Sequence, residues 1–151
     1  MNINFFMNKA LEQANKALIF DEVPIGAVLV DNITEQIIFS AHNLVNFIGN
    51  ASSHAEILII NESCKIRKSK FLTQTSLFVT LEPCIMCASA ISEVKINKIY
   101  FGAYDEKKGG IESIMRTYNQ KHLFVPEIYG GIEENKCSTI LKSFFKNKRI
   151  K

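Results

Sequence analysis

The sequence predicts an α/β fold in which helices cover one sheet, and three observations support this prediction. Segments with the three- and four-residue periodicity of helices alternate with short runs rich in β-branched and aromatic residues. The chain has 151 residues, 47% of them hydrophobic and 22% charged, which suits a globular protein with a substantial core. Because no repeat, linker or low-complexity run divides residues 1–151, we expect a single domain.

The first half of the chain is predicted to contain a helix, a hairpin and a second helix. An apolar face predicts the helix over 4–20; its members are Met7, Ala10, Leu11, Ala14 and Leu18. The runs 25–30 and 37–41 are expected to pair across the turn signal at 31–32, and the polar segment 43–53 predicts a loop. The second helix is expected to begin at a serine cap, Ser52 or Ser53, and to end near residue 66.

The second half continues the alternation. A strand is expected over 76–81, followed by a helix over 84–94 whose first turn tolerates Pro83. The run 98–103 predicts another strand, and a short helix near 111–118 and a strand near 124–129 are expected after it. The last helix is predicted to begin around Glu133, because apolar residues recur on one face from Cys137 to Phe145.

The charge of the chain is concentrated at its C-terminal end. The formal net charge of +3 neither requires nor excludes a nucleic-acid partner. The last ten residues hold cations and no acid: Lys142, Lys146, Lys148, Arg149 and Lys151. Such a cluster is typical either of a solvated helix face or of a surface that contacts phosphates.

The chain shows neither a secretion signal at its N-terminus nor an apolar run near the ~20 residues that span a bilayer. We therefore expect a cytoplasmic protein without a membrane partner. Since a reducing compartment disfavours disulfides, the four cysteines are expected to serve as thiols, with metal binding or catalysis as possible roles.

Two short motifs combine residue types that bind metals and move protons. They are H-A-E at 54–56 and P-C-I-M-C at 83–87, and each lies at a predicted helix start. A helix N-terminus favours the thiolate forms of Cys84 and Cys87, and thiolate is the form that binds zinc. With His54 as a third ligand, the fourth tetrahedral position remains for water, which is typical of a catalytic zinc site.

Glu56 follows His54 by two residues, a spacing that turns the two side chains apart in the first turn of a helix. Its carboxylate is therefore expected to face the activated water rather than to bind the metal. In that position it can take a proton from the water and return it to the substrate, so we predict that Glu56 is the proton shuttle.

The same residues also suit simpler roles. The cysteine pair is compatible with a thioredoxin-like redox pair or with half of a structural zinc site. The first interpretation leaves His54 and Glu56 without a role, and Cys64 and Cys137 do not form the second pair that a structural site needs. Taken separately, His54 suits a core histidine, and Glu56 suits an acid that the helix dipole favours.

The H-x-E and P-C-x-x-C pattern resembles that of the zinc nucleobase deaminases. The chain is similar to bacterial tRNA-specific adenosine deaminases over almost its whole length. The matching segments are VPIGAVLV (23–30), His42-Asn43, HAE (54–56), TLEPCIMCASA (80–90), YFGAYDEKKGG (100–110) and SFFKNKR (143–149).

This resemblance implies a cytidine-deaminase-like fold, a three-layer α/β/α arrangement with a central five-stranded mixed sheet. It implies hydrolytic deamination of the wobble adenosine of a tRNA anticodon to inosine, in a homodimer that holds the anticodon stem-loop near the subunit interface. It also implies one zinc ion per subunit, bound by His54, Cys84 and Cys87, with Glu56 as the acid and base.

Three further residues match substrate-binding positions of the family. Asn43 matches an asparagine that contacts the flipped base, although it also suits a loop residue that caps a turn. Asp105 matches an acid near the RNA, and its alternative is an ordinary loop carboxylate. Phe145 matches an aromatic residue near the RNA, and core packing is an equal alternative. The chain departs from the family at Tyr104, where arginine is common, and at His122, for which we expect a surface or core position.

Two rival functions remain open. One is deamination of a free base or nucleoside, either guanine or cytosine/cytidine, by another enzyme of the same superfamily. The other is a non-catalytic, zinc-containing partner subunit that binds RNA. Such subunits typically lack the glutamate, so the presence of Glu56 argues against the second rival.

Overall fold

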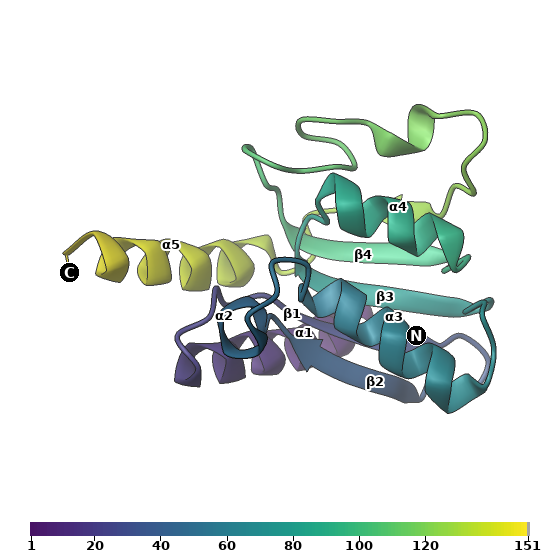
Figure 1. Ribbon diagram of the computed structural model, residues 1–151, viewed down its shortest axis with the longest axis horizontal. Coiled ribbons are helices and arrows are strands. Elements are labelled where there is room, and N and C mark those ends of the chain that lie inside the picture. The colour runs from purple at the N-terminus through teal and green to yellow at the C-terminus, as the bar shows by residue number, and fades with distance from the viewer. Residues whose placement is uncertain (151) are drawn as a thin grey trace.

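The computed structural model describes residues 1–150, without the side chains of Arg149 and Ile150, and this part of the chain forms a five-stranded mixed sheet between two layers of helices (Figure 1). The strand order is β2-β1-β3-β4-β5, with β1 antiparallel to both of its neighbours and the last two pairings parallel. The strands are β1 (Gly26–Asp31), β2 (Ile37–His42), β3 (Thr75–Leu81), β4 (Lys98–Ala103) and β5 (Glu127–Tyr129).

Helices cover both faces of this sheet. The helices α1 (Ile3–Ile19) and α5 (Glu134–Ile150) lie on one face, and α3 (Ala55–Arg67) and α4 (Ile85–Glu93) lie on the other (Figure 1). Side chains of the central strands alternate between the two layers, as the pleat requires. Val28 packs in the core beside α1, whereas Leu29 packs in the core beside α3. This burial on both faces accounts for the apolar run of β1.

Helix α1 packs directly on β1 at Gly26. A Cβ atom there would lie 2.1 Å from the carbonyl oxygen of Ala10, so a side chain at this position would push the helix off the sheet. The close packing fixes the segment between α1 and β1, which contains the buried Glu22.

Three boundaries predicted from the sequence are wrong. A four-residue helix, α2 (Val45–Ile48), lies inside the predicted loop 43–53. The N-cap residue of α3 is His54 and not a serine. The strand expected over 124–129 is shortened to β5, because Pro126 has no N–H to donate to a ladder.

The prediction of a helix near 111–118 is also wrong, because the structure has no α-helix there. The segment forms turns followed by a short 3-10 helix, η1 (Thr117–Asn119). The N–H groups of Ile114 and Met115 both bond to the carbonyl of Gly109, and the N–H of Thr117 bonds to that of Gly110. These bonds span five to seven residues, so they close a wide loop and not the four-residue steps of an α-helix.

Helix α5 packs on the sheet with its first half and extends beyond it with its second (Figure 1). Cys137 and Leu141 are buried, whereas Phe145 is 45% exposed. Lys148 near the end of the helix forms an ion pair with Asp21, and Lys151 of the basic cluster lies outside the described residues. Within residues 1–150 we find no helix that is both long and apolar enough to cross a membrane.

Candidate active site and metal centre

Two strand-to-helix junctions meet on one face of the sheet and bring the two sequence motifs together. His54 is the N-cap residue of α3 and Cys84 is the N-cap residue of α4. Both have extended backbones, with ψ angles of 152° and 173°. Cys87 lies in the first turn of α4 and is buried. The predicted grouping of His54, Cys84 and Cys87 is therefore present in the fold.

The three side chains are spaced as a tetrahedral zinc site requires. The Nδ1 atom of His54 lies 3.7 Å from the sulfur of Cys84 and 3.6 Å from that of Cys87. Zinc bonds of about 2.3 Å to sulfur and about 2.0–2.1 Å to nitrogen would separate such ligand atoms by about 3.6 Å. In residues 1–150 these are the three ligand atoms that lie within 4.8 Å of one another, so the donor set and its geometry fit zinc.

The two sulfurs differ in their protonation. Hydrogen bonding from Cys87 lowers the pKa of Cys84 to about 4 against the effect of burial, and His54 contributes in the same direction. The hydrogen bond to Cys84, together with burial, raises the pKa of Cys87. The pKa of His54 is also raised, first by its hydrogen bond to Cys84. These three side chains share hydrogen bonds through their protons. A divalent cation bound among them would displace those protons, because metal ligands bind in their deprotonated forms.

Glu56 lies in the first turn of α3 and is 4% exposed. The pKa of its carboxyl is raised to about 7, first by burial and also by the charge of Cys84, while the charge of His54 opposes the rise. A carboxyl with a pKa near neutrality can both accept and donate a proton under physiological conditions. The geometry is thus suitable for a proton shuttle beside the metal ligands.

Asn43 is buried, with 5% of its surface exposed, and it connects β2 to the start of α3. Its Oδ1 atom accepts a hydrogen bond of 2.9 Å from the N–H of Ala55, which satisfies one of the free donors of the helix. Its Nδ2 atom has no hydrogen-bond partner among the described residues. Asn43 therefore caps the helix that carries His54 and Glu56, and it can also donate to a ligand.

Glu82 is a functional candidate that the sequence analysis missed. It is 2% exposed, and its carboxylate accepts hydrogen bonds from the loop that follows β4. The donors are the N–H groups of Asp105, Ile111, Glu112 and Ser113 and the hydroxyl of Ser113. Burial alone would raise the pKa of Glu82, but these hydrogen bonds hold it below its usual value. The available signal was an acid directly after an apolar strand run and directly before Pro83.

Glu22 is a second buried acid that the sequence analysis missed. It is 1% exposed, and its Oε1 atom accepts hydrogen bonds of 2.7 Å from the N–H of Asn46 and 2.8 Å from that of Phe47. These two donors belong to the first turn of α2, where helical N–H groups lack partners. Glu22 therefore fixes α2 beside the junction that carries Asn43 and His54.

The other predicted residues lie outside the cluster. Asp105 is half-buried, and its Oδ1 accepts hydrogen bonds of 3.0 Å from the N–H groups of Lys107 and Lys108. Phe145 lies on the projecting half of α5, in the helix layer opposite to α3 and α4, and contacts the ring of Phe144 edge-on. His122 is exposed on a loop, as expected for a surface histidine.

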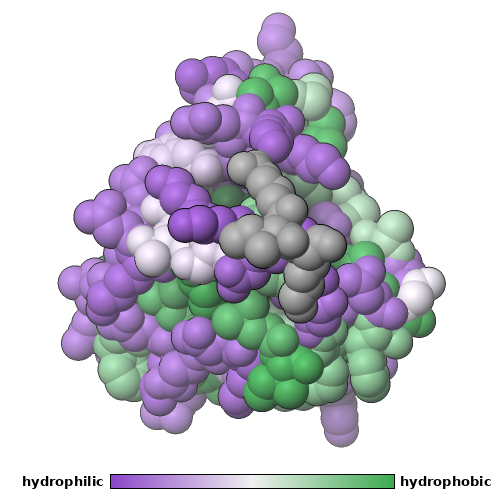
Figure 2. All heavy atoms as spheres, turned by 90° about the vertical axis from the view of Figure 1, so that its left-hand side faces the viewer, coloured by the Kyte–Doolittle hydropathy of each residue, from purple (hydrophilic) through white to green (hydrophobic). Residues whose placement is uncertain are grey.

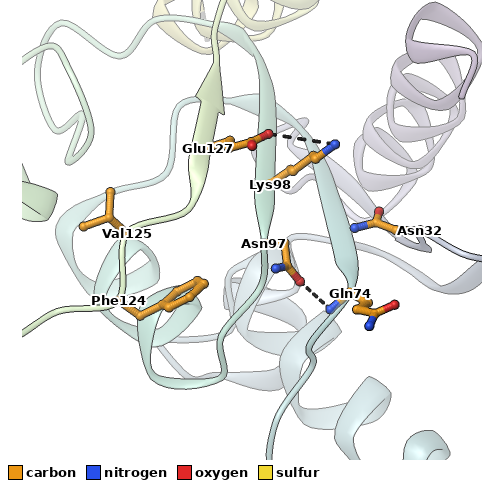
Figure 3. A pocket seen from close by; sticks show the side chains of 7 residues that line it. All are labelled: Asn32, Gln74, Asn97, Lys98, Phe124, Val125 and Glu127. Carbon is orange, nitrogen blue, oxygen red and sulfur yellow. Dashed lines mark hydrogen bonds and ion pairs between the residues drawn. The ribbon is translucent and has the colours of Figure 1, made fainter.

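A surface cavity of about 380 Å³ lies at the other end of the sheet (Figure 3). It is lined by Asn32, Gln74, Asn97, Lys98, Phe124, Val125 and Glu127. Lys98 and Glu127 in its lining form an ion pair of 3.8 Å, and Asn97 accepts a hydrogen bond from the N–H of Gln74. Strand β3 spans seven residues, or roughly 20 Å at about 3.3 Å per residue, between this cavity and the cysteine pair. The cavity is thus separate from the candidate site.

Comparisons of the sequence with known proteins give consistent matches. The family model of the cytidine and deoxycytidylate deaminase zinc-binding region matches residues 1–103. A tRNA-specific adenosine deaminase of Rickettsia felis is 44% identical over 144 residues, which are 95% of this chain and 100% of that protein. One of Bacillus subtilis is 40% identical over 147 residues, which are 97% of this chain and 90% of that protein.

Solved structures agree with these matches. A structure from a study of A-to-I editing by tRNA:A34 deaminases at the wobble position superposes with a TM-score of 0.87 at 40% identity, over 91% of this chain and 99% of that one. This superposition confirms the expected three-layer fold. The guanine deaminase of Nitrosomonas europaea superposes with a TM-score of 0.81 at 17% identity, over 93% of this chain and 83% of that one, which is a likeness of fold alone.

Proposed function

The chain belongs to the tRNA-specific adenosine deaminase family, and from this membership we propose that it converts the wobble adenosine of a tRNA anticodon to inosine. It is an enzyme, and zinc is its cofactor. The observation that carries the proposal is an identity of 44% over the full length of the Rickettsia felis relative. The buried Glu56 beside His54, Cys84 and Cys87 supports the chemistry.

We assign the metal ligands to His54, Cys84 and Cys87, with one zinc ion per subunit. Zinc, when bound there, supplies the Lewis acidity that makes water a nucleophile near neutral pH. The net reaction adds water at C6 of adenine and releases ammonia. Glu56 accepts a proton from the water, donates it to N1 of the ring, and then carries a second proton to the departing amino group.

The substrate we propose is the anticodon stem-loop. Its target base must leave the stack to reach Glu56, which costs a few kcal/mol, and less in an unpaired loop. We assign the Nδ2 atom of Asn43 to a hydrogen bond with that base, because its Oδ1 atom accepts from the N–H of Ala55. We assign Asp105 and Phe145 to contacts with the flanking RNA.

Two further properties complete the proposal. We propose that the enzyme is a homodimer, which sedimentation equilibrium of the purified protein tests directly. We also propose that it acts in the cytoplasm, where its substrate is found, and fractionation of cells that express the protein tests the location.

The decisive experiment compares substrates on the zinc-loaded protein. The substrates are an anticodon stem-loop with adenosine at the wobble position, the same RNA with that adenosine moved by one nucleotide, and free guanine, cytosine and cytidine. We expect inosine in the first RNA, none in the second, and no ammonia from the free compounds. Deamination of a free compound without RNA turnover would favour the free-base enzyme, and single-turnover reactions without any product would favour the non-catalytic partner.

A further inference from the structure

Three aromatic side chains form a connected cluster at the end of the molecule where α1, β2 and α2 meet. The rings of Phe20 and His42 are stacked, with centroids 5.5 Å apart and planes inclined by 24°. The ring of Phe47 meets that of Phe20 edge-on at 5.2 Å. We refer to Phe20, His42 and Phe47 as the aromatic platform.

The platform faces solvent. Phe20 is 42% exposed and Phe47 is 68% exposed, and no residue of α2 is buried. Core packing therefore does not account for the position of Phe47. The backbone beneath it is nevertheless held by two hydrogen bonds to the buried carboxylate of Glu22. A buried charge that fixes an exposed ring indicates that the ring serves a contact outside the fold.

An ion pair connects the C-terminal half of α5 to the edge of the platform. Lys148 forms an ion pair with Asp21, the neighbour of Phe20 in the chain, so the basic half of α5 reaches the edge of the platform. Lys142 and Lys146 on the same helix are exposed. Figure 2 shows this end of the molecule, where hydrophobic side chains lie exposed among hydrophilic ones. Rings combined with cations are the features that bind unpaired nucleotides.

The platform is also joined to the candidate active site. His42 directly precedes Asn43, and the Nδ1 atom of His42 lies 3.0 Å from the backbone carbonyl oxygen of Asn43. Asn43 in turn caps α3, which begins beside His54 and carries Glu56. Asn43 therefore connects the platform to the start of α3.

We propose that the aromatic platform stacks one unpaired nucleotide of the RNA next to the adenosine that is deaminated, while lysines of α5 contact its phosphates. This inference rests on the proposed function and names a specific subsite for it. RNA is favoured over a second protein chain, because the exposed rings adjoin cations and stacking on an aromatic face accepts any base.

The test replaces the ring but keeps an apolar side chain. Binding of an anticodon stem-loop RNA is measured by fluorescence anisotropy for the zinc-loaded wild type and for Phe47→Leu and Phe47→Tyr. We expect Phe47→Leu to raise Kd about ten-fold, within the roughly 5- to 150-fold that stacking of one base supplies. Phe47→Tyr keeps the π face, so its Kd should stay within about two-fold of the wild-type value.

The matched control is Phe71→Leu. Phe71 is also exposed, at 37%, and it also lies beside cations, with Lys70 and Lys95 within 5.6 Å of its ring centre. It lies in the connection between α3 and β3, away from the platform. We expect this variant to bind the RNA like the wild type, and thermal melting checks that both variants fold.

RNAs with an abasic nucleotide at each position around the target locate the contact. One abasic position should abolish the difference between the wild type and Phe47→Leu, because the stacked base is then missing. Equal affinities of the wild type and Phe47→Leu for the intact RNA would overturn the proposal, as would a change in the subunit number of Phe47→Leu, which would identify an interface between copies. If the wild type itself neither binds nor deaminates the RNA, the proposed function fails instead.

Discussion

Two loops border the candidate active site, and each is fastened by one buried glutamate. The loop after β4 donates its backbone N–H groups to Glu82, and α2 donates two of its own to Glu22. The first loop is packed against the cysteine motif: Gly109 forms a bridge with Cys84, and the N–H of Gly110 bonds to the carbonyl of Pro83. None of the residues of α2 is buried.

The difference shows that a buried glutamate that accepts backbone hydrogen bonds has two different roles in this fold. On the Glu82 side there is no room for side chains, since a Cβ atom on Gly109 would lie 2.6 Å from the Glu82 carboxyl carbon and one on Gly110 would lie 2.5 Å from the nitrogen of Ile85. That loop therefore braces the junction that holds Cys84 and Cys87. On the Glu22 side the carboxylate holds a surface in place, and the side chains of that surface point to solvent.

The largest effects are expected at the cluster that the two loops enclose. Cys87→Ala removes a buried thiol that we assign as a zinc ligand, and it should abolish both zinc content and activity. Glu56→Gln should retain zinc but lower kcat by about 10²–10⁴-fold, because it removes the acid and base. Metal analysis and inosine formation on the same samples check both results. Turnover by Glu56→Gln at the wild-type rate would contradict the assigned role.

The next effect is expected from Glu82→Gln. The amide keeps the shape of the side chain but loses the charge that several N–H donors share, so the free energy of unfolding should fall by roughly 2–4 kcal/mol. Zinc affinity should fall about 10–100-fold, as it does when a group that orients ligands is removed. Denaturant unfolding and competition with a chelator measure the two quantities. The control is Glu106→Gln, an exposed acid of the same loop.

Glu22→Gln should have a smaller and different effect. The carboxylate of Glu22 accepts hydrogen bonds from two backbone donors, so we expect its replacement to lower the free energy of unfolding by about 1–2 kcal/mol. Zinc affinity should be unchanged, while KM for the stem-loop RNA rises and kcat stays near the wild-type value. If Glu22→Gln lost zinc as readily as Glu82→Gln, the distinction between a brace for the metal site and a support for a surface would be wrong.

The smallest effect is expected from Lys148→Ala. Its ion pair with Asp21 is largely exposed, with 42% and 70% of the two side chains accessible, so the free energy of unfolding should change by less than about 1 kcal/mol. RNA affinity should weaken, and the slope of log Kd against log salt should decrease by about 1 if Lys148 contacts a phosphate. Lys70→Ala is the control, and equal slopes for the two variants would argue for a merely solvated tail.

Much of the site could be predicted from the sequence, because its chemistry depends on side chains at fixed spacings. His54, Cys84 and Cys87 are metal-binding residue types at helix starts, and the structure brings them together. The order of helices and strands also followed from periodicity. Helix α2 has four residues, which are too few to show a helical period. The segment 111–118 contains enough apolar residues to resemble an amphipathic helix, although it forms turns.

The two glutamates could not be predicted in the same way. Their partners are backbone N–H groups, which are present in every residue and leave no pattern in the sequence. Asn43 combines both cases: its position next to His42 matched a family motif, but its cap on Ala55 depends on how the loop 43–53 folds back. The roles of Asp105 and Phe145 stay predictions, because their partners lie outside this chain.

The position of the proposed ligands at the starts of two separate helices would also make the metal a reporter of correct folding. His54 and Cys84 are 30 positions apart, and β3, which leads into the cysteine motif, is aligned by its pairing with β1. A register slip of one residue would move Cys84 by about 3.3 Å and turn the strand over. A chain with that error would not assemble the ligand set. At saturating zinc, the zinc content of a preparation is thus expected to follow the fraction of molecules whose central strands are aligned.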